Sequence, residues 1–194
     1  MKLNRQRTAM GHPRILDRDK AALLIIDFQE AFRRAIPDFG TVAARIATIA
    51  RGFSILGRPV FLTEQYPKGL GHTVEEILLS VPEDVRVFQK SRFGAGLDSA
   101  LLEAFSEQGI SQIAVCGIEA HICVNQSVHD FLDAGYTVHL LRDCVSSRFE
   151  TDRFSAIEKM LASGAVSATV ESALFEMLED SQAPEFRQIQ ELIK

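Results

Sequence analysis

The sequence predicts an α/β protein: a three-layer α/β/α domain built around an open, mostly parallel sheet of six strands. Short apolar runs alternate with segments in which apolar residues recur every three or four positions, and a glycine follows most of those segments. Strands that alternate with helices of this length indicate βαβ units, and these place helices on both faces of a parallel sheet.

The first half of the chain contains three of the predicted strands. Ala21–Phe28 is apolar at nearly every position, which is typical of a strand buried on both faces. Apolar residues recur at 4-3-4-3 spacing over 42–56, which predicts a helix that ends at Gly57. Pro59–Thr63 and Val85–Gln89 have the composition of strands, and between them a glycine-bearing loop precedes a short helix over 74–80.

The second half repeats one pattern three times: a helix, a glycine that stops it, and a strand. The helices are predicted at 97–105, 124–132 and 154–161, and the strands at 113–117, 136–141 and 166–170. We therefore divide the chain into a polar, mildly basic arm at 1–20, one domain at 21–180 and a C-terminal helical tail at 181–194.

Composition excludes several classes of function. The 194 residues carry a formal net charge of −5, so nucleic acid, which binds to basic surfaces, is not an expected partner. The longest apolar run, Ala21–Ile26, is far shorter than the ~18 residues that cross a membrane. The first twenty residues lack the apolar stretch of a secretory signal, and three cysteines do not form a disulfide framework. We therefore expect a cytoplasmic protein.

Three chemically capable residues stand at the carboxyl ends of predicted strands. Asp27 closes the first strand, Lys90 closes the third, and Cys123 lies just beyond the fourth at a helix start. Each alone has a structural explanation, as a helix cap, a solvated lysine or a buried thiol. Open parallel sheets bind ligands outside the carboxyl ends of their strands, so we expect the three to meet in one crevice.

These three groups make a coherent catalytic set. The thiolate is the reactive form of cysteine, whose free pKa is near 8.5. A helix start and the Lys90 ammonium would stabilise thiolate, and the Asp27 carboxylate could accept the proton. We therefore expect Cys123 to react well below about pH 8. The backbone N–H groups of the turn before Cys123 are candidates for an oxyanion hole.

Four stretches carry a further signal: LLIIDFQEAF, RPVFLTEQYPKGLG, FQKSRFGA and AVCGIEAHICVNQSVHDFLDAGYTVHLLRDCVSSR. In them the chain resembles the isochorismatase-like cysteine hydrolase superfamily, which includes nicotinamidases and N-carbamoyl amidohydrolases. EQYPKGLG and GIEAHICV look most like the branch of isochorismatase domain-containing proteins. The resemblance implies a Rossmann-like fold and a homo-oligomer.

The resemblance also implies roles for individual residues. Asp27 corresponds to the general base, Lys90 to the cation that stabilises thiolate and intermediate, and Cys123 to the nucleophile. A non-proline cis peptide is implied between Ile118 and Glu119, with the backbone N–H groups of Glu119 and Cys123 as the oxyanion hole.

Two departures from the family pattern affect the expected substrate. Nicotinamidases carry an Asp-x-His metal cluster after the second strand, where this chain reads TEQYPKGLGH, so with His72 alone we expect no metal and no other cofactor. Glu119 stands where many members have a smaller residue, and we expect it either to narrow the pocket or to pair with a basic group. Nicotinamide and isochorismate are both poor guesses for the substrate.

Five residues flank the expected catalytic positions and are candidates to line the pocket: Phe28, Phe32, Tyr66, Phe93 and His121. For the aromatic residues, packing is an equal alternative. His121 lies two residues before Cys123, and side chains so spaced on a helical turn diverge, so we expect no direct pair between them.

The resulting hypothesis is a cofactor-independent cysteine hydrolase that cleaves a small amide, ureido or related acyl compound through a covalent thioester. Two alternatives remain open. One is a catalytically idle oligomeric scaffold that binds other proteins. The other is a thiol redox sensor that uses Cys123 with Cys144, which could approach the crevice from the end of the fifth strand; Cys116 is expected to be buried and unreactive.

Overall fold

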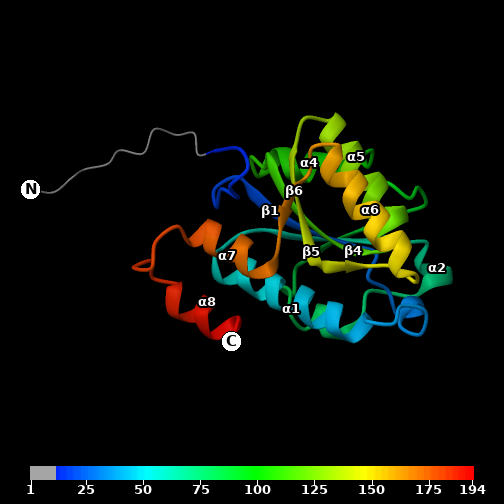
Figure 1. Cartoon of the computed structure of the whole chain (residues 1–194), viewed down its shortest axis with the longest axis horizontal. Coiled ribbons are helices and arrows are strands. Elements are labelled where there is room, and N and C mark those ends of the chain that lie inside the picture. Colours follow the sequence, from blue (N-terminus) through cyan, green and yellow to red (C-terminus); the bar gives the residue numbers. More distant parts are fainter. Residues whose placement is uncertain (1–11) are drawn as a thin grey trace, which may run out of the picture.

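A single sheet of six parallel strands forms the centre of the protein (Figure 1). The structure is a computed structural model and describes residues 12–194. The strands follow the order β3-β2-β1-β4-β5-β6. Their bounds are β1 Ala21–Ile26, β2 Val60–Gln65, β3 Arg86–Lys90, β4 Gln112–Ile118, β5 Thr137–Ser146 and β6 Val166–Ala168. The predicted α/β fold class is confirmed, and every neighbouring pair of strands is parallel.

Helices cover both faces of the sheet. In Figure 1, α1 (Phe39–Ile55), α7 (Val170–Leu178) and α8 (Phe186–Leu192) lie on one side, and α4 (Ser99–Glu107), α5 (Asn125–Asp133) and α6 (Glu150–Ala162) lie on the other. Shorter helical turns occupy the loops: η1 (Glu30–Phe32), α2 (Pro67–Leu70), α3 (Glu75–Leu78) and η2 (Ala120–Val124). The result is the three-layer arrangement that the sequence predicts.

Two separate apolar cores hold the layers together. Leu23 and Ile25 of β1 pack with α1 and α7 in one core, which we call the α1-side core. Leu24 and Ile26 pack with α4, α5 and α6 in the other, the α5-side core. Successive side chains of a strand point to opposite faces, which explains why β1 is apolar at every position.

Several predicted strand ends differ from the structure by one or two residues, among them the end of β1, which stops at Ile26 and not at Phe28; the end of β5 differs most. β5 continues past Leu141 to Ser146, because a bulge between Val115 and Gly117 lets the two strands resume pairing beyond the polar Arg142 and Asp143. At the other end of the sheet, the strand predicted over 166–170 stops at Ala168. Thr169 caps α7 there, and this helix was not predicted.

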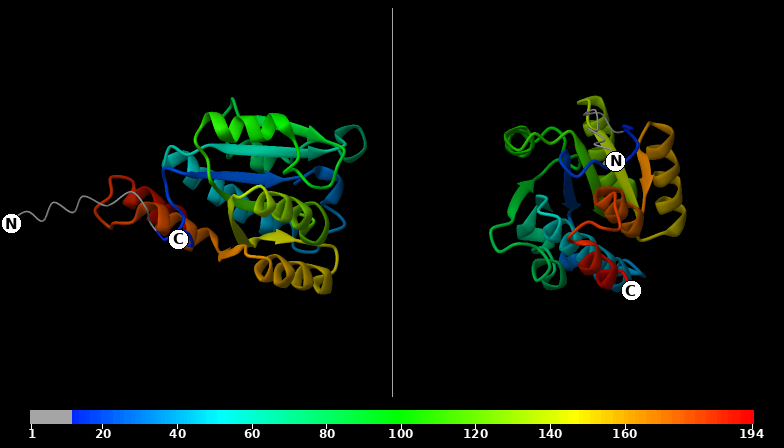
Figure 2. Two further views of the ribbon diagram at one scale, coloured as in Figure 1. Left: turned by 90° about the horizontal axis from the view of Figure 1, so that it is seen from above. Right: turned by 90° about the vertical axis from the view of Figure 1, so that its left-hand side faces the viewer.

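The two ends of the described chain pack on the α1 side. Leu16 is fully buried in the α1-side core, and its N–H donates to Glu176 Oε2 at 2.8 Å. Arg18 forms an ion pair with Glu185 at 2.8 Å, and α8 rests on α1 through the buried Ile189 (Figure 2). Positions 1–11 of the expected arm lie outside the described residues. Within 12–194, no helix has both the length and the apolar character needed to cross a bilayer.

The chain order creates a switch point between β1 and β4, since β2 and β3 follow β1 on one side and β5 and β6 follow β4 on the other. Gly117 allows close contact there: its φ is +122°, and a Cβ at this position would overlap the carbonyl oxygen of Ile26. The carboxyl ends of β1 and β4 are thereby held side by side.

Candidate active site

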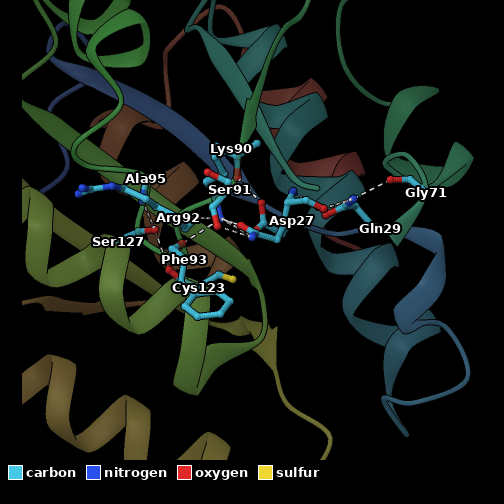
Figure 3. A network of polar contacts seen from close by, with 12 residues as sticks. Asp27, Gln29, Gly71, Lys90, Ser91, Arg92, Phe93, Ala95, Cys123 and Ser127 are labelled. Atoms are coloured by element: carbon cyan, nitrogen blue, oxygen red, sulfur yellow. Dashed lines mark hydrogen bonds and ion pairs between the residues drawn. The ribbon is translucent and has the colours of Figure 1, made fainter. Parts of the chain in front are cut away.

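Asp27, Lys90 and Cys123 meet at the carboxyl edge of the sheet, beside the switch point (Figure 3). Asp27 follows β1 directly, is fully buried, and has a φ of +49°, a left-handed conformation that Asp tolerates better than most residues. Its Oδ1 accepts a hydrogen bond from Thr63 Oγ1 at 2.7 Å, and its Oδ2 accepts one from Lys90 Nζ at 2.6 Å. Both carboxylate oxygens are therefore fixed in direction.

The Lys90 ammonium is buried but surrounded by acceptors. Besides Asp27, its Nζ lies 2.9 Å from Gln65 Oε1, 2.8 Å from the carbonyl of Phe93 and 3.2 Å from that of Arg92. A buried charge is tolerated when it is paired and hydrogen-bonded. These contacts hold the cation at one place beside the carboxylate.

Cys123 lies in the η2 turn that joins β4 to α5, close enough to Asp27 and Lys90 for both charges to act on its thiol. Burial raises the pKa of this thiol to about 12; the negative charge of Asp27 acts in the same direction and the charge of Lys90 opposes it. The expectation that Cys123 would ionise below pH 8 is therefore wrong. At neutral pH the structure has a protonated thiol beside a carboxylate acceptor.

The turn before Cys123 has an unusual backbone. The peptide bond between Ile118 and Glu119 is cis, and the Glu119 carbonyl accepts from the N–H groups of Ile122 at 3.1 Å and Val124 at 3.2 Å. This turn lies between the end of β4 and the start of α5. Glu119 and Cys123 stand at its two ends, where their N–H groups are the expected oxyanion donors.

A family model described as the isochorismatase domain matches residues 21–172. The chain belongs to the isochorismatase family. Isochorismatase domain-containing protein 1 of Salmo salar is 38% identical over 168 residues, which are 87% of this chain; the match spans 59% of that longer relative. Isochorismatase domain-containing protein 2 of Danio rerio is 37% identical over 173 residues, 89% of this chain and 86% of the relative.

A solved structure has the same fold. The MAR1 ribonuclease structure from Caenorhabditis elegans aligns with a TM-score of 0.88 and 34% sequence identity over 92% of each chain. The resemblance inferred from the sequence motifs is confirmed at the level of the family.

Three residues of this isochorismatase-family site were missed from the sequence. Thr63 and Gln65 alternate at the end of β2, between the strands that carry Asp27 and Lys90, and this spacing puts both on one face. Ser127 lies four residues after Cys123, the distance of one helical turn. Each is an uncharged polar residue near an element end, and residue type alone does not distinguish such a residue from a solvated loop residue.

Ser127 connects two parts of the site. Its fully buried hydroxyl donates to the Cys123 carbonyl at 2.7 Å and accepts from the Ala95 N–H at 2.9 Å (Figure 3). Ala95 belongs to the loop whose Phe93 carbonyl accepts from Lys90. One hydroxyl thus couples the Cys123 turn to the loop that holds the lysine.

The candidate pocket residues have different environments. Phe28 is buried in the α1-side core against the ring of Phe39, at 4.4 Å between centroids, and Phe32 packs on that core. Tyr66 and Phe93 are exposed, at 60% and 51%. His121 directs Nδ1 to Ser147 Oγ at 3.0 Å and has Nε2 3.8 Å from Asp152, so neither nitrogen pairs with Cys123.

The residues after β2 are joined to the end of that strand by hydrogen bonds. His72 Nδ1 lies 3.0 Å from Glu64 Oε2, while Glu64 Oε1 accepts from the N–H and hydroxyl of Thr73. These contacts tie the end of β2 to the loop before α3. In the described part of the chain, no three His, Cys, Asp or Glu side chains are grouped so that they could hold a metal ion.

Proposed function

We propose that this isochorismatase-family hydrolase cleaves the C–N bond of a small amide or ureido compound, or a related acyl bond, through a thioester on Cys123 and without a cofactor. The observation that carries the proposal is the position of the Asp27 carboxylate, which accepts from the Lys90 ammonium and is close enough to the Cys123 thiol to act on its pKa. A nucleophile, its base and a fixed cation are the parts that acyl transfer to cysteine requires.

In the first half of the reaction, Asp27 takes the thiol proton while Cys123 Sγ forms a bond to the substrate carbonyl carbon. The carbonyl π electrons move to oxygen. When the tetrahedral intermediate collapses, the C–N bond breaks, and Asp27 returns the proton to the leaving nitrogen. Because the thiol pKa is raised, this proton transfer accompanies attack and no resting thiolate is needed.

In the second half, Asp27 removes a proton from water as the water oxygen attacks the thioester carbonyl. The C–S bond breaks, the acid leaves, and Cys123 regains its proton. Lys90 stabilises the negative charge near Asp27 in both halves, and it is already held by its acceptors, so little reorganisation is required. The backbone N–H groups of Glu119 and Cys123 hold the oxyanion.

A redox-sensor role for Cys123 with Cys144 has less support. Cys144 is buried in the α1-side core and Cys123 lies in the α5-side core, on the other face of the sheet. A disulfide between them would require the sheet to rearrange. An idle scaffold also has less support, because a buried Lys–Asp pair contributes little net stability and is more easily explained by catalysis.

The cell compartment and assembly are part of the same proposal. Cys116, Cys123 and Cys144 are all free thiols, as expected in a reducing cytoplasm. Large apolar side chains such as Leu79, Leu97 and Phe149 are more than half exposed, which supports contacts between copies of the chain in a homo-oligomer.

The test is release of amine or ammonia from a panel of small amides and ureido compounds. We expect turnover by the wild type, with losses of at least about 10³-fold in Cys123→Ser and Asp27→Asn. Cys144→Ala, which changes a thiol outside the site, should keep its activity. An RNA oligonucleotide belongs in the panel because of the ribonuclease named above, and the net charge of −5 predicts no cleavage. Full turnover by Cys123→Ser would refute the proposal.

A further inference from the structure

Gln29 carries a fully buried amide beside the carboxyl edge of the sheet. It lies two residues after Asp27, and its N–H donates to the Asp27 carbonyl at 2.8 Å, which closes the turn in which Asp27 has its left-handed φ. A buried amide is normally hydrogen-bonded, so its partners show what it holds in place. The mechanism proposed above leaves this side chain without a role.

The Gln29 side chain forms a reciprocal pair with the backbone of Gln65, at the end of β2. Its Oε1 accepts from the Gln65 N–H at 2.8 Å, and its Nε2 donates to the Gln65 carbonyl at 3.1 Å. The pairing of β1 with β2 ends at Ile26 and Thr63, two residues before Gln65. The amide therefore continues, from a side chain, the kind of hydrogen bonding that a neighbouring strand supplies.

The same amide also holds the loop that follows β2. Gln29 Nε2 donates to the Gly71 carbonyl at 2.6 Å, as Figure 3 shows. Gly71 has a φ of +73°, and Tyr66, at the start of the loop, has a φ of +38°. A left-handed residue other than glycine persists where the surrounding contacts enforce it. Gln29 thus fixes the loop on both sides to the turn that carries Asp27.

Fixing the Gln65 backbone determines where the Gln65 side chain points. Its Oε1 accepts from Lys90 Nζ at 2.9 Å, and its Nε2 donates to the Ser91 carbonyl at 2.8 Å. The two amides act in series, because Gln29 holds the backbone of Gln65 and the Gln65 side chain holds Lys90. Lys90 in turn donates to Asp27, so the network begins and ends at the same turn.

The position of Lys90 has a measurable effect on Cys123. Burial and the negative charge of Asp27 raise the pKa of the thiol, and the positive charge of Lys90 lowers it. A lysine that moves away from this place stabilises the thiolate less, since the interaction falls with distance. The reactivity of Cys123 therefore reports whether Lys90 is held.

We propose that Gln29 is a positioning residue, which acts through Gln65 to keep the Lys90 ammonium beside Asp27 and Cys123. In the described chain its side-chain hydrogen bonds all go to backbone atoms, so its effect on the lysine is indirect. This inference rests on the proposed function, whose cation Gln29 holds. A residue that only tied down the loop would have the opposite effect on the thiol, because its loss would open the site and expose Cys123.

The test is the rate at which iodoacetamide alkylates Cys123 at pH 9, with the site identified by peptide mapping. Gln29→Met keeps the side-chain length and removes the amide, and we expect it to slow alkylation at least about threefold, because less of the thiol is ionised. Gln65→Met should slow it to a similar extent, and adding Gln29→Met to that variant should have no further effect. The control is Gln108→Met, which changes an exposed glutamine at the end of α4 and should leave the rate unchanged.

Three results would overturn the proposal. Faster alkylation of Gln29→Met would show a loosened site, an unchanged rate would show a lysine that stays in place without Gln29, and additive losses in the double variant would show an effect that bypasses Gln65. If circular dichroism shows that Gln29→Met does not fold, Gln29→Asn decides in the same way. Its amide is one methylene short of the contacts with Gln65 and Gly71, so slower alkylation is expected there too.

Failure of this proposal and failure of the hydrolase proposal are distinguishable. With a substrate from the panel, Gln29→Met should lower kcat at least about tenfold with little change in KM, because the cation stabilises the transition state less. An unchanged kcat would overturn the positioning role and leave the hydrolase proposal standing. If the wild type turns over nothing, the hydrolase proposal fails, and the alkylation rates still decide whether Gln29 positions Lys90.

Discussion

Lys90 Nζ lies 2.6 Å from Asp27 Oδ2, and both side chains are almost completely removed from solvent. Asp27 also accepts from Thr63, so one carboxylate has donors from β2 and β3, and its charge acts on the Cys123 thiol in the η2 turn. The parallel order of the strands makes this convergence possible, because the ends of β1, β2 and β3 are neighbours. The buried pair is thus the physical centre of the site.

Replacing Lys90 with Met should destabilise the protein and abolish turnover. The substitution leaves the Asp27 charge buried without its cation, which costs about 3–5 kcal/mol of unfolding free energy. Urea denaturation measures the loss. The double variant Asp27→Asn/Lys90→Met removes both charges and should recover part of that stability without activity. A single Lys90→Met variant as stable as wild type would mean that the pair is not buried as described.

Ser127→Ala should weaken the coupling between the Cys123 turn and the 91–97 loop. Without the hydroxyl, the Cys123 carbonyl and the Ala95 N–H lose a buried partner, at a cost of about 1–3 kcal/mol. We expect kcat to fall by roughly tenfold, since the nucleophile is less well positioned. Thermal melting and steady-state kinetics check this, with the exposed Ser106→Ala as control. Equal effects of the two variants would contradict the role of Ser127.

Alkylation of Cys123 should be slow at neutral pH. Burial and the charge of Asp27 raise the pKa of the thiol to about 12, so the iodoacetamide rate should still be rising above pH 9. Asp27→Asn removes a negative charge that disfavours thiolate, and it should therefore move the alkylation profile to lower pH. Peptide mapping of the alkylated protein identifies the site. A wild-type midpoint near 8.5 would show that the environment does not raise the thiol pKa.

His139 should make the fold sensitive to acid. It is buried in β5 with neither ring nitrogen hydrogen-bonded in the described chain, and burial lowers its pKa to about 4. Between that value and the usual 6.5, the unfolded state binds a proton that the folded state does not, so stability falls as the pH falls. The loss from pH 7 to pH 5 should be roughly 2 kcal/mol. In urea titrations, the unfolding free energy of His139→Leu should lose about this much less between pH 7 and pH 5 than that of the wild type. An identical pH dependence of the two proteins would contradict the acid sensitivity assigned to His139.

The sequence predicted the fold and the meeting of Asp27, Lys90 and Cys123 at one edge of the sheet because both depend on local patterns. A continuous apolar run identifies β1, and Asp27 ends it; the glycine stops after the later helices separate the remaining elements. Strand ends were less predictable. Arg142 and Asp143 interrupt the apolar pattern of β5, and the register shift explains why the pairing continues beyond them: the extra residues of β5 lie opposite Cys116, and Val145 then pairs with Gly117.

Contacts between distant segments could not be predicted in the same way. Three contacts join residues at least 25 positions apart: Gln65 with Lys90, Ala95 with Ser127, and Glu119 with Arg148. The second contact of Ser127, to the Cys123 carbonyl, is local. The direction of the Cys123 pKa shift also depends on contacts between distant segments. A helix start and a lysine suggested a lowered value, but burial outweighs both once the sheet and helices are assembled.

The most direct test of the central claim is the mass of the protein during turnover. The wild type is mixed with its best substrate from the amide and ureido panel, quenched in acid within milliseconds to seconds, and measured by intact and peptide mass spectrometry. Our account predicts an acyl group on Cys123 that forms before the acid product appears and is absent in Cys123→Ser. Steady turnover with no adduct at any time, or an adduct on Cys116 or Cys144, would contradict it.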